Sequence, residues 1–561
     1  MMRLLRVTVF ILLFSFPLTA EEPRFEWDNV ERIVAIGDIH GAYDNLVRVL
    51  QNANLIDEKL RWVGGAAHLV QNGDMVDRGP YSRKAMDLLM KLEDKAVDAG
   101  GRVHVLIGNH EAMNVIGILD LVSAEEYEAF VDRDSRKRRD RIFDRYYEQL
   151  RREARSRGED SPKKRVTREE FDRDYPLGFV EHRQAFSSDG KYGKWIQAHN
   201  TAVKINGIVF SHGDWSEEFS KMDIAEVNLR IRQELRGESP IQEGIAFDTA
   251  SPLQYRGLAQ TELTTVAQES AQPLVARILQ NLGAKRMVVG HTVTVGVIES
   301  RFDGKHISID VGMLELYRGG HRVALEIVNG EIRAIHDGGT IPIPESMNAD
   351  TLGAYRNAVA EVDPTNVDVQ LKRVDAMRDD GRLDEAAPIL ESLIEIKPTH
   401  IPFRYRELLG TYYLERGDTA GAEAQFRAYI DGLAAMVTSN PSNLNLANLL
   451  ARFCVEKGLE IDLAEEVIGS AMKRAPDNYN FRLTMARVRI AQDDFSNVFE
   501  ILDVLEEPVA FAYDTNYLYG LAYVGLNQRD KARTAFEQAI DAEPERQEAR
   551  EALDRLGASR N

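Results

Sequence analysis

At 561 residues the chain is too long for one hydrophobic core, so two or three domains are expected. Its 44% hydrophobic and 29% charged residues are typical of globular proteins, which excludes a fibrous or largely disordered chain. The formal net charge of −20 argues against a nucleic-acid-binding protein, and we expect no nucleic-acid partner.

Residues 1–20 predict a secretory signal peptide. Two arginines precede an apolar run, 7–16, and cleavage after Ala20 would leave Glu21 as the first residue. The alternative is an uncleaved anchor, but the run is shorter than the ~20 residues that span a bilayer. We therefore expect export to the periplasm and no membrane span after cleavage. Cys454 is the only cysteine, so no disulfide can form within the chain, which fits the bacterial periplasm better than a disulfide-stapled extracellular domain.

Residues 28–341 predict an α/β domain, in which short apolar strands alternate with helical segments. Each predicted strand ends in polar or small residues, and ligands of layered α/β proteins bind at such strand ends. The predicted strands are IVAIG (33–37), HLVQNG (68–73), VHVLIG (103–108), GIVFSHG (207–213), MVVGH (287–291) and HISIDVG (306–312).

An insertion at 120–176 interrupts this pattern with an unusual density of charge. Between 132 and 174, sixteen Lys/Arg stand against twelve Asp/Glu, a net charge of +4. Apolar residues at helical spacing predict a docked helix. They are Ile142, Phe143, Tyr146, Tyr147 and Leu150. Two interpretations stay open: a solvated, ion-paired cap helix, or a basic lid that attracts an acidic phosphorylated substrate.

Residues 363–555 predict helices alone, in repeats of about 34 residues typical of tetratricopeptide proteins. The best copy spans 513–544 and has small and aromatic residues at the helix-packing positions. These are Gly520, Tyr523, Ala532, Phe536 and Ala539, followed by Pro544. Gly410 and Phe426 occupy equivalent positions in a second copy. We expect a solenoid of four or five repeats that binds a protein partner; the alternative is a non-repetitive helical bundle.

Three strings carry the predicted chemistry: GDIHG at 37–41, GDMVDRG at 73–79 and GNHE at 108–111. Their polar residues directly follow predicted strands, and two later strands also end in histidine. The predicted metal ligands are Asp38, His40, Asp74, Asn109, His212 and His291, with His199 as the alternative to His212. Oxygen and imidazole donors of this kind suit a pair of Mn, Fe or Zn ions that activate water, with Mn favoured.

Four further residues are predicted to act on a phosphoryl group. His110 follows a ligand directly and would protonate the leaving oxygen, while Asp77 would orient its imidazole. Arg78 and Arg256 would bind the phosphoryl oxygens as bidentate donors. Asp310, near the end of the last predicted strand, is expected to hold its loop rather than to bind metal.

Together with the later SHG and GHT strings, these motifs resemble the phosphoprotein phosphatase superfamily of dinuclear metallophosphoesterases. AMNVIGILDLVSAEEYEAF (112–130), GFVEHRQAFSSDGKYGKWI (178–196) and SPLQYRG (251–257) resemble its Shewanella-like branch. The resemblance implies a calcineurin-like fold, with two β-sheets flanked by helices. It also implies hydrolysis of phosphotyrosine or phosphoserine/threonine in proteins. Two positions depart from the family pattern: Asp214 replaces a second glycine after SHG, and Gln254 replaces a tryptophan.

Two other functions remain open at this point. The same metal site would serve a small-molecule or nucleotide phosphohydrolase, such as a dinucleoside polyphosphatase. A scaffold with an inert phosphatase domain is the other alternative, although an inert domain is expected to lose ligands and this chain keeps the full predicted set.

Overall fold

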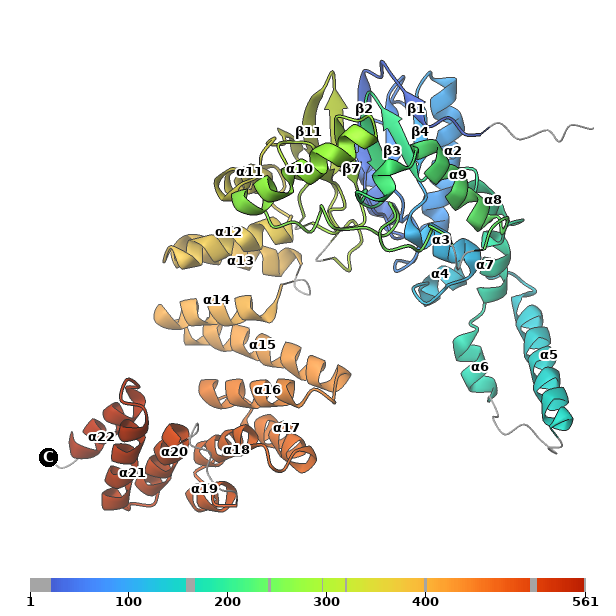
Figure 1. Ribbon diagram of the computed structural model, residues 1–561. Helices are drawn as coiled ribbons and strands as arrows, with labels where there is room; N and C mark the ends of the chain where they lie inside the picture. Colours follow the sequence, from blue (N-terminus) through green and yellow to red (C-terminus); the bar gives the residue numbers. More distant parts are fainter. Residues whose placement is uncertain are drawn as a thin grey trace, which may run out of the picture. The chain divides into compact units, whose positions relative to one another are not determined.

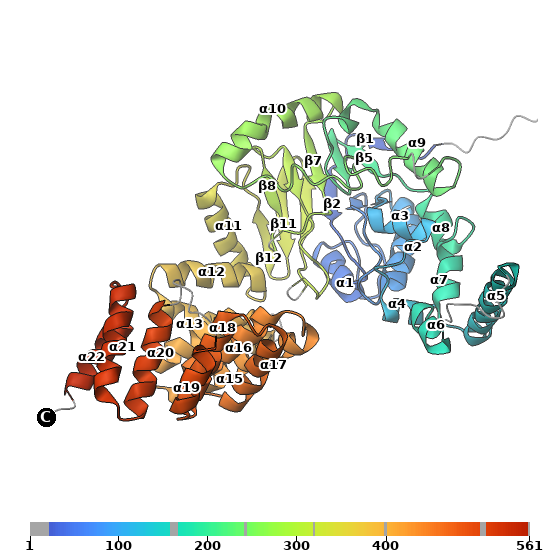
Figure 2. The same ribbon diagram turned by 60° about the horizontal axis from the view of Figure 1, so that its bottom comes forward.

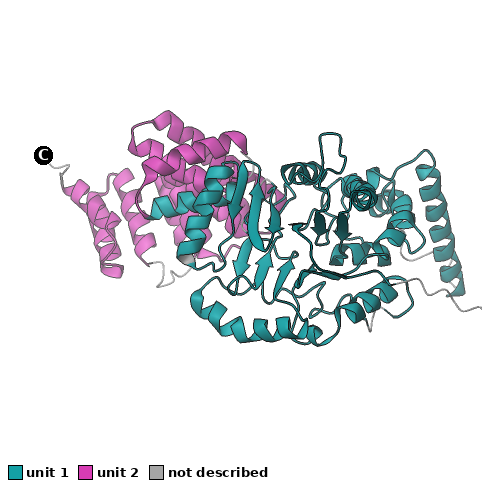
Figure 3. Ribbon diagram, turned by 90° about the horizontal axis from the view of Figure 1, so that it is seen from above, with its two compact units in different colours: residues 1–379 teal, residues 380–561 magenta. Residues whose placement is uncertain are grey.

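The computed structural model describes residues 22–157, 167–240, 244–294, 296–317, 320–397, 401–504 and 512–558. The predicted signal peptide, 1–20, lies outside these residues. The chain divides into two compact units, residues 1–379 and 380–561 (Figure 3). Within the described ranges, no helix combines the length and the apolar character needed to cross a bilayer.

The first unit contains two six-stranded sheets (Figures 1 and 2). One has the strand order β12-β11-β10-β2-β3-β4 and the other β1-β5-β6-β7-β9-β8. Strands β2, β3 and β4 run parallel, as do β6, β7 and β9. The strands are β1 (Glu26–Trp27), β2 (Arg32–Ile36), β3 (His68–Gln71), β4 (Arg102–Val105), β5 (Ala202–Ile205), β6 (Ile208–Ser211), β7 (Arg286–Val289), β8 (Glu299–Arg301), β9 (His306–Ser308), β10 (Ala324–Val328), β11 (Glu331–His336) and β12 (Gly339–Pro342).

Both faces of the parallel strands are buried, which explains their continuous apolar sequence. In β2, Ile33 and Ala35 belong to a core cluster that also includes Val288 of the other sheet. Val34 and Ile36 point the other way, into a cluster shared with helices α1 and α2. The core therefore lies in two layers, one between the sheets and one beneath the flanking helices.

Helices flank both sheets: α1 and α2 cover the sheet that contains β2, and α9 and α10 lie outside the other (Figure 2). The helices of the first unit are α1 (Tyr43–Asn52), α2 (Ser82–Asp98), α3 (Asn109–Ile116), α4 (Ala124–Glu128), α5 (Ser135–Ser156), α6 (Arg168–Asp174), α7 (Phe179–Phe186), α8 (Lys191–Ile196), α9 (Ile224–Leu235), α10 (Thr265–Asn281), α11 (Ala349–Val362) and α12 (Val367–Asp379), with a 3₁₀ turn at Phe219–Lys221.

The α/β architecture predicted for the N-terminal domain is confirmed. All six predicted strands are present, as β2, β3, β4, β6, β7 and β9. The antiparallel strands β10–β12 were not predicted; β10 pairs with β2, so the last part of the domain completes the first sheet.

Within the described part of the charged insertion, α4 is followed by α5 and α6, which extend beyond α7 away from the sheets (Figure 1). Phe143 of α5 packs against Phe171 of α6, with 5.0 Å between ring centroids. Arg138 of α5 forms ion pairs with Asp132 and with Glu181 of α7. The predicted aromatic face of α5 thus packs on α6.

Helix α12, at the start of the predicted repeat region, packs within the first unit. The Asn366 side chain donates a hydrogen bond to the Gly296 carbonyl at 2.8 Å, and His321 pairs with Asp368 at 3.0 Å. These contacts tie the helix to loops of the α/β fold, and the second unit begins at residue 380.

The described residues of the second unit form helices and the turns between them, as predicted for the solenoid. Its helices pack as successive pairs, α14 with α15, α16 with α17, α18 with α19 and α20 with α21. Gly520 lies against the Phe536 ring so closely that a Cβ atom would overlap it, and Gly410 meets Phe426 in the same way. The helices are α13 (Leu383–Ile396), α14 (Phe403–Glu415), α15 (Thr419–Ser439), α16 (Leu444–Lys457), α17 (Ile461–Arg474), α18 (Tyr479–Ala491), α19 (Phe495–Leu502), α20 (Ala512–Gly525), α21 (Arg529–Ala542) and α22 (Glu548–Ala558).

Candidate active site

The two sets of parallel strands bring the six predicted ligands together at their carboxyl ends. Asp38 and His40 follow β2, Asp74 follows β3 and Asn109 begins α3 after β4. From the other sheet, His212 follows β6 and His291 follows β7. We call these six residues the ligand cluster: Asp38, His40, Asp74, Asn109, His212 and His291, all of them buried.

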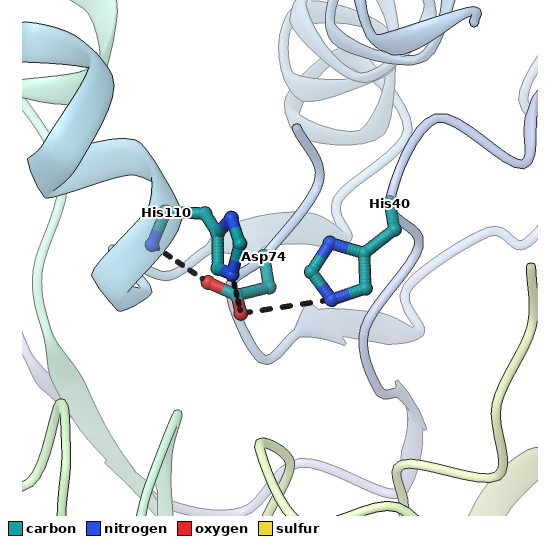
Figure 4. A group of neighbouring side chains, drawn as sticks. All are labelled: His40, Asp74 and His110. Atoms are coloured by element: carbon teal, nitrogen blue, oxygen red, sulfur yellow. Dashed lines mark hydrogen bonds and ion pairs between the residues drawn. The ribbon is translucent and has the colours of Figure 1, made fainter. Parts of the chain in front are cut away.

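Asp74 lies at the centre of the ligand cluster. Its Oδ2 atom is 3.8 Å from His40 Nε2, 3.7 Å from His110 Nε2 and 3.3 Å from His212 Nε2. Figure 4 shows the rings of His40 and His110 on either side of this carboxylate. In the described part of the chain, two groups of side chains have ligand atoms close enough to hold a metal ion: His40, Asp74 and His110, and Asp74, His212 and His291. Asp74 belongs to both groups.

The remaining two predicted ligands, Asp38 and Asn109, join the same cluster. Asp38 Oδ2 is 3.8 Å from His40 Nε2, and Asp38 Oδ1 accepts a hydrogen bond from the His291 backbone N–H at 3.0 Å. Asn109 Oδ1 lies 2.9 Å from His212 Nε2. Every predicted ligand therefore has at least one neighbour from the set.

Backbone carbonyls fix the tautomers of the three imidazoles in the ligand cluster. His40 Nδ1 bonds to the Val76 carbonyl and His212 Nδ1 to the Asn72 carbonyl, each at 2.9 Å. His291 Nε2 bonds to the Gln254 carbonyl at 3.1 Å. A carbonyl only accepts hydrogen bonds, so each of these nitrogens carries the proton and the other ring nitrogen presents its lone pair. This arrangement is typical of metal-ligating histidines.

The electrostatics of the ligand cluster favour a bound cation. Burial lowers the pKa of His40 to about 3 and that of His291 to about 2, so both imidazoles are neutral at physiological pH. Burial, together with the charges of Asp310 and Asp74, raises the pKa of Asp38 well above its usual value. A cation would relieve this crowding of buried carboxylates. The two carboxylates also lie close against the backbone. A Cβ atom at Gly108 would overlap the Asp74 carboxylate, and one at Gly290 would overlap the Asp38 carboxylate.

His110 and Asp77 form a buried pair beside the cluster. His110 Nδ1 donates to Asp77 Oδ2 at 2.6 Å, and Asn114 donates to the other oxygen at 2.8 Å. Burial lowers the pKa of His110, but the charges of Asp74 and Asp77 outweigh it and the pKa is raised. The protonated imidazole that a general acid requires is thus favoured, with Nε2 facing Asp74.

The two predicted arginines approach the cluster through different histidines. Arg78 Nη1 lies 2.8 Å from His40 Nε2, and the same nitrogen donates to the Tyr317 hydroxyl. Arg256 donates to the His291 carbonyl, and its Nη2 lies 3.2 Å from His291 Nδ1. Both guanidinium groups therefore reach the ring nitrogens that face the site.

Two residues of the site were missed by the sequence analysis. Tyr317 comes from the loop after β9 and holds Arg78; nothing in the local sequence marks it. Glu111 is the last residue of the GNHE string, and its carboxylate accepts backbone N–H groups from Asp74, Met75 and Gly108, each at 2.8 Å. Its place in the string was the available signal.

The other predicted candidates lie as follows. Asp310 is buried next to the cluster and accepts a hydrogen bond from the Gly312 N–H at 3.0 Å; burial raises its pKa to about 6. His199 bonds to Glu93 at 2.8 Å and does not join the cluster.

Several site residues have a backbone conformation that is rare outside glycine. φ is positive at His40 (46°), Asp74 (54°), Asp77 (70°), Arg78 (67°) and His291 (65°). Such conformations cost roughly 1–3 kcal/mol each and concentrate at functional sites. The surrounding hydrogen bonds hold these loops in place.

A family model described as calcineurin-like phosphoesterase matches residues 31–295, and a tetratricopeptide repeat model matches 513–546. Shewanella-like protein phosphatase 2 of Arabidopsis thaliana is 30% identical over 324 residues, which cover 54% of this chain and 77% of that protein. The chain belongs to the calcineurin-like phosphoesterases, with Shewanella-like phosphatases as homologues.

Two further proteins are similar to parts of this chain. Shewanella-like protein phosphatase 1 of Plasmodium berghei is 28% identical over 298 residues, covering 51% of this chain and 69% of that protein. The crystal structure of a cold-active protein-tyrosine phosphatase from a psychrophilic Shewanella species is 23% identical, with a TM-score of 0.43, over 58% of this chain and 83% of that one. Membership of the calcineurin-like phosphoesterases makes the chain a phosphoester hydrolase, with a tetratricopeptide repeat near its C-terminus.

Proposed function

We propose that the first unit hydrolyses phosphomonoesters on proteins with the help of two divalent metal ions. The observation that carries the proposal is the position of Asp74, whose carboxylate belongs to both groups of possible metal ligands. The six residues of the ligand cluster would hold the ions, with Asp74 shared between them. Bound ions would lower the pKa of water and polarise the phosphoryl group.

The residues around the cluster would supply the remaining steps. Arg78 and Arg256 would bind the phosphoryl oxygens, because each guanidinium already lies beside a cluster histidine. His110 would give the proton on Nε2 to the leaving oxygen, and Asp77 would hold the imidazole in place. The arrangement suits phosphotyrosine and phosphoserine/threonine alike, since both need a phosphoryl clamp and a general acid.

A phosphorylated protein or peptide is the proposed substrate. The two relatives described above are named protein phosphatases, which supports this class over nucleotides. The second unit would bind a protein partner, as expected of stacked tetratricopeptide helices. We further propose manganese as the metal and the periplasm as the compartment, the latter from residues 1–20 alone.

The test is a side-by-side comparison of initial rates with Mn²⁺ on phosphotyrosine peptides, phosphoserine peptides and a dinucleoside polyphosphate. Asp74→Asn is the control, because it keeps the side-chain size and removes the shared charge. Preference for either peptide, lost in the control, supports a protein phosphatase. Preference for the nucleotide would overturn the substrate class while leaving phosphoester hydrolysis intact.

A further inference from the structure

Asp214 departs from the family pattern, and its side chain does not join the ligand cluster. It lies two residues after His212 and is fully buried. Its Oδ1 accepts a hydrogen bond from His306 Nε2 at 2.6 Å, and its Oδ2 accepts the backbone N–H groups of Leu258 and Ala259 at 2.7 and 2.8 Å. Both carboxylate oxygens are thus occupied by donors from the protein itself.

The backbone N–H groups of Gly213 and Asp214 bind residues that precede Arg256 in the chain. The Gly213 N–H donates to the Pro252 carbonyl at 2.7 Å, and the Asp214 N–H donates to the Tyr255 carbonyl at 2.8 Å. Two hydrogen bonds therefore precede Arg256 in sequence and two follow it. Residues 252–259, which we call the arginine segment, are fastened to the end of β6 on both sides of that arginine.

The arginine segment reaches the site through His291. The Gln254 backbone carbonyl accepts a hydrogen bond from His291 Nε2 at 3.1 Å. The Arg256 guanidinium bonds to the carbonyl and to Nδ1 of His291. A shift of the segment would therefore displace the guanidinium. Misplacement of a binding group by about 1 Å can cost ~100-fold in rate.

We propose that Asp214, supported by His306, is a positioning residue that places Arg256 against the phosphoryl group. The inference rests on the role proposed above for Arg256. An asparagine at 214 keeps the volume but must turn its NH₂ group either toward the two backbone N–H donors or toward His306. The second choice would require His306 to move its proton to Nδ1, which is buried without a hydrogen-bond partner.

The test is a double-mutant cycle on the full-length chain, with an aryl phosphate as substrate. Asp214→Asn is expected to lower kcat/KM by about tenfold or more in the wild-type background. In an Arg256→Ala background the same change should alter kcat/KM by no more than about twofold, because the group it positions is gone. In an Arg78→Ala background the full effect should remain. Bound metal, measured on the same samples, should be unchanged.

The control is Glu234→Gln, another buried carboxylate that accepts two consecutive backbone N–H groups, those of Ile245 and Ala246. Glu234→Gln should lower the free energy of unfolding, and any effect that it has on kcat/KM should be the same with and without Arg256. If Asp214→Asn does not fold, His306→Gln carries the cycle, with a smaller effect and the same dependence.

The outcomes separate this inference from the proposed function. An equal loss with and without Arg256, no loss at all, or loss of bound metal would overturn the positioning role of Asp214. If Arg256→Ala alone leaves kcat/KM unchanged, the phosphoryl-binding role of Arg256 fails, and the inference fails with it while hydrolysis itself stands.

Discussion

Replacement of Glu111 by glutamine should weaken metal binding without touching a ligand. The Glu111 carboxylate accepts three backbone N–H groups, two on Oε2 from Asp74 and Gly108 and one on Oε1 from Met75. A glutamine has a single carbonyl oxygen, so its NH₂ group must face at least one of these donors. The loops that carry Asp74 and Asn109 would lose a shared anchor.

The size of the effect follows from the number of bonds. A hydrogen bond to a charged group contributes about 1.5–3 kcal/mol. In the glutamine variant at least one such bond is lost, and the side-chain NH₂ group then faces a backbone N–H, so that two donors oppose each other. We expect the free energy of unfolding to fall by about 2–4 kcal/mol. The three N–H groups belong to Asp74 or to residues next to Asp74 and Asn109, two members of the ligand cluster. Metal affinity should therefore fall roughly 10–100-fold.

The assay is a Mn²⁺ titration in competition with a chelator, together with urea unfolding followed by tryptophan fluorescence. All four tryptophans lie in the first unit, so the signal reports on that unit. Measurement at pH 8 keeps Glu111 ionised, since burial and the charge of Asp74 raise its pKa to about 7. Glu126→Gln is the control: this buried carboxylate accepts the Ser82 hydroxyl at 2.7 Å outside the ligand cluster. Wild-type metal affinity in Glu111→Gln, or an equal loss in Glu126→Gln, would refute the reasoning.

Three other predictions follow from the structure. His110→Ala should keep bound metal yet lose ~10²–10⁴-fold turnover on a phosphoserine peptide, and wild-type turnover there would exclude it as the proton donor. A chain ending at 379 should hydrolyse an aryl phosphate within about twofold of the full-length rate. A chain ending at 362 should be less stable and slower, because it loses the hydrogen bond from Asn366 to the Gly296 carbonyl. Equal rates for the two truncated chains would show that α12 does not support the site. Burial lowers the pKa of His336 to about 4, below an unfolded value of ~6.5, so the folded state binds fewer protons and stability is lost as the pH falls through this window. Between pH 7.5 and 5 this amounts to about 2 kcal/mol, and urea unfolding of His336→Gln should show a correspondingly smaller acid loss; an unchanged acid loss would contradict it.

The positions of the cluster residues could be predicted because the signal is local. Asp38, Asp74 and His212 each lie within three residues of the end of a buried strand, and parallel strands deliver their ends to one edge of a sheet. The convergence of the two sheets is not visible in any one string. The expectation that the two sheets converge rests on the resemblance to a known family, which covers the first domain.

The supporting contacts could not be predicted, because they join segments far apart in the chain. Tyr317 holds Arg78 across more than 200 residues, and its loop has no pattern that marks the pairing. The strand β10 pairs with β2 across a similar separation. Such pairings depend on how loops close in three dimensions, and neither periodicity nor turn residues encode that.

Each half of the site depends on a buried carboxylate that binds backbone amides. Glu111 holds the loops after β3 and β4. Asp214, which follows β6, holds the arginine segment. Because their oxygens are occupied by N–H donors, neither competes for a metal ion. Asp38 and Asp74 are left as the carboxylates that face the imidazoles of the ligand cluster. We therefore expect neutral substitutions to act differently in the two groups: at Glu111 or Asp214 they should disturb geometry, while at Asp74 they should remove the charge that a cation needs.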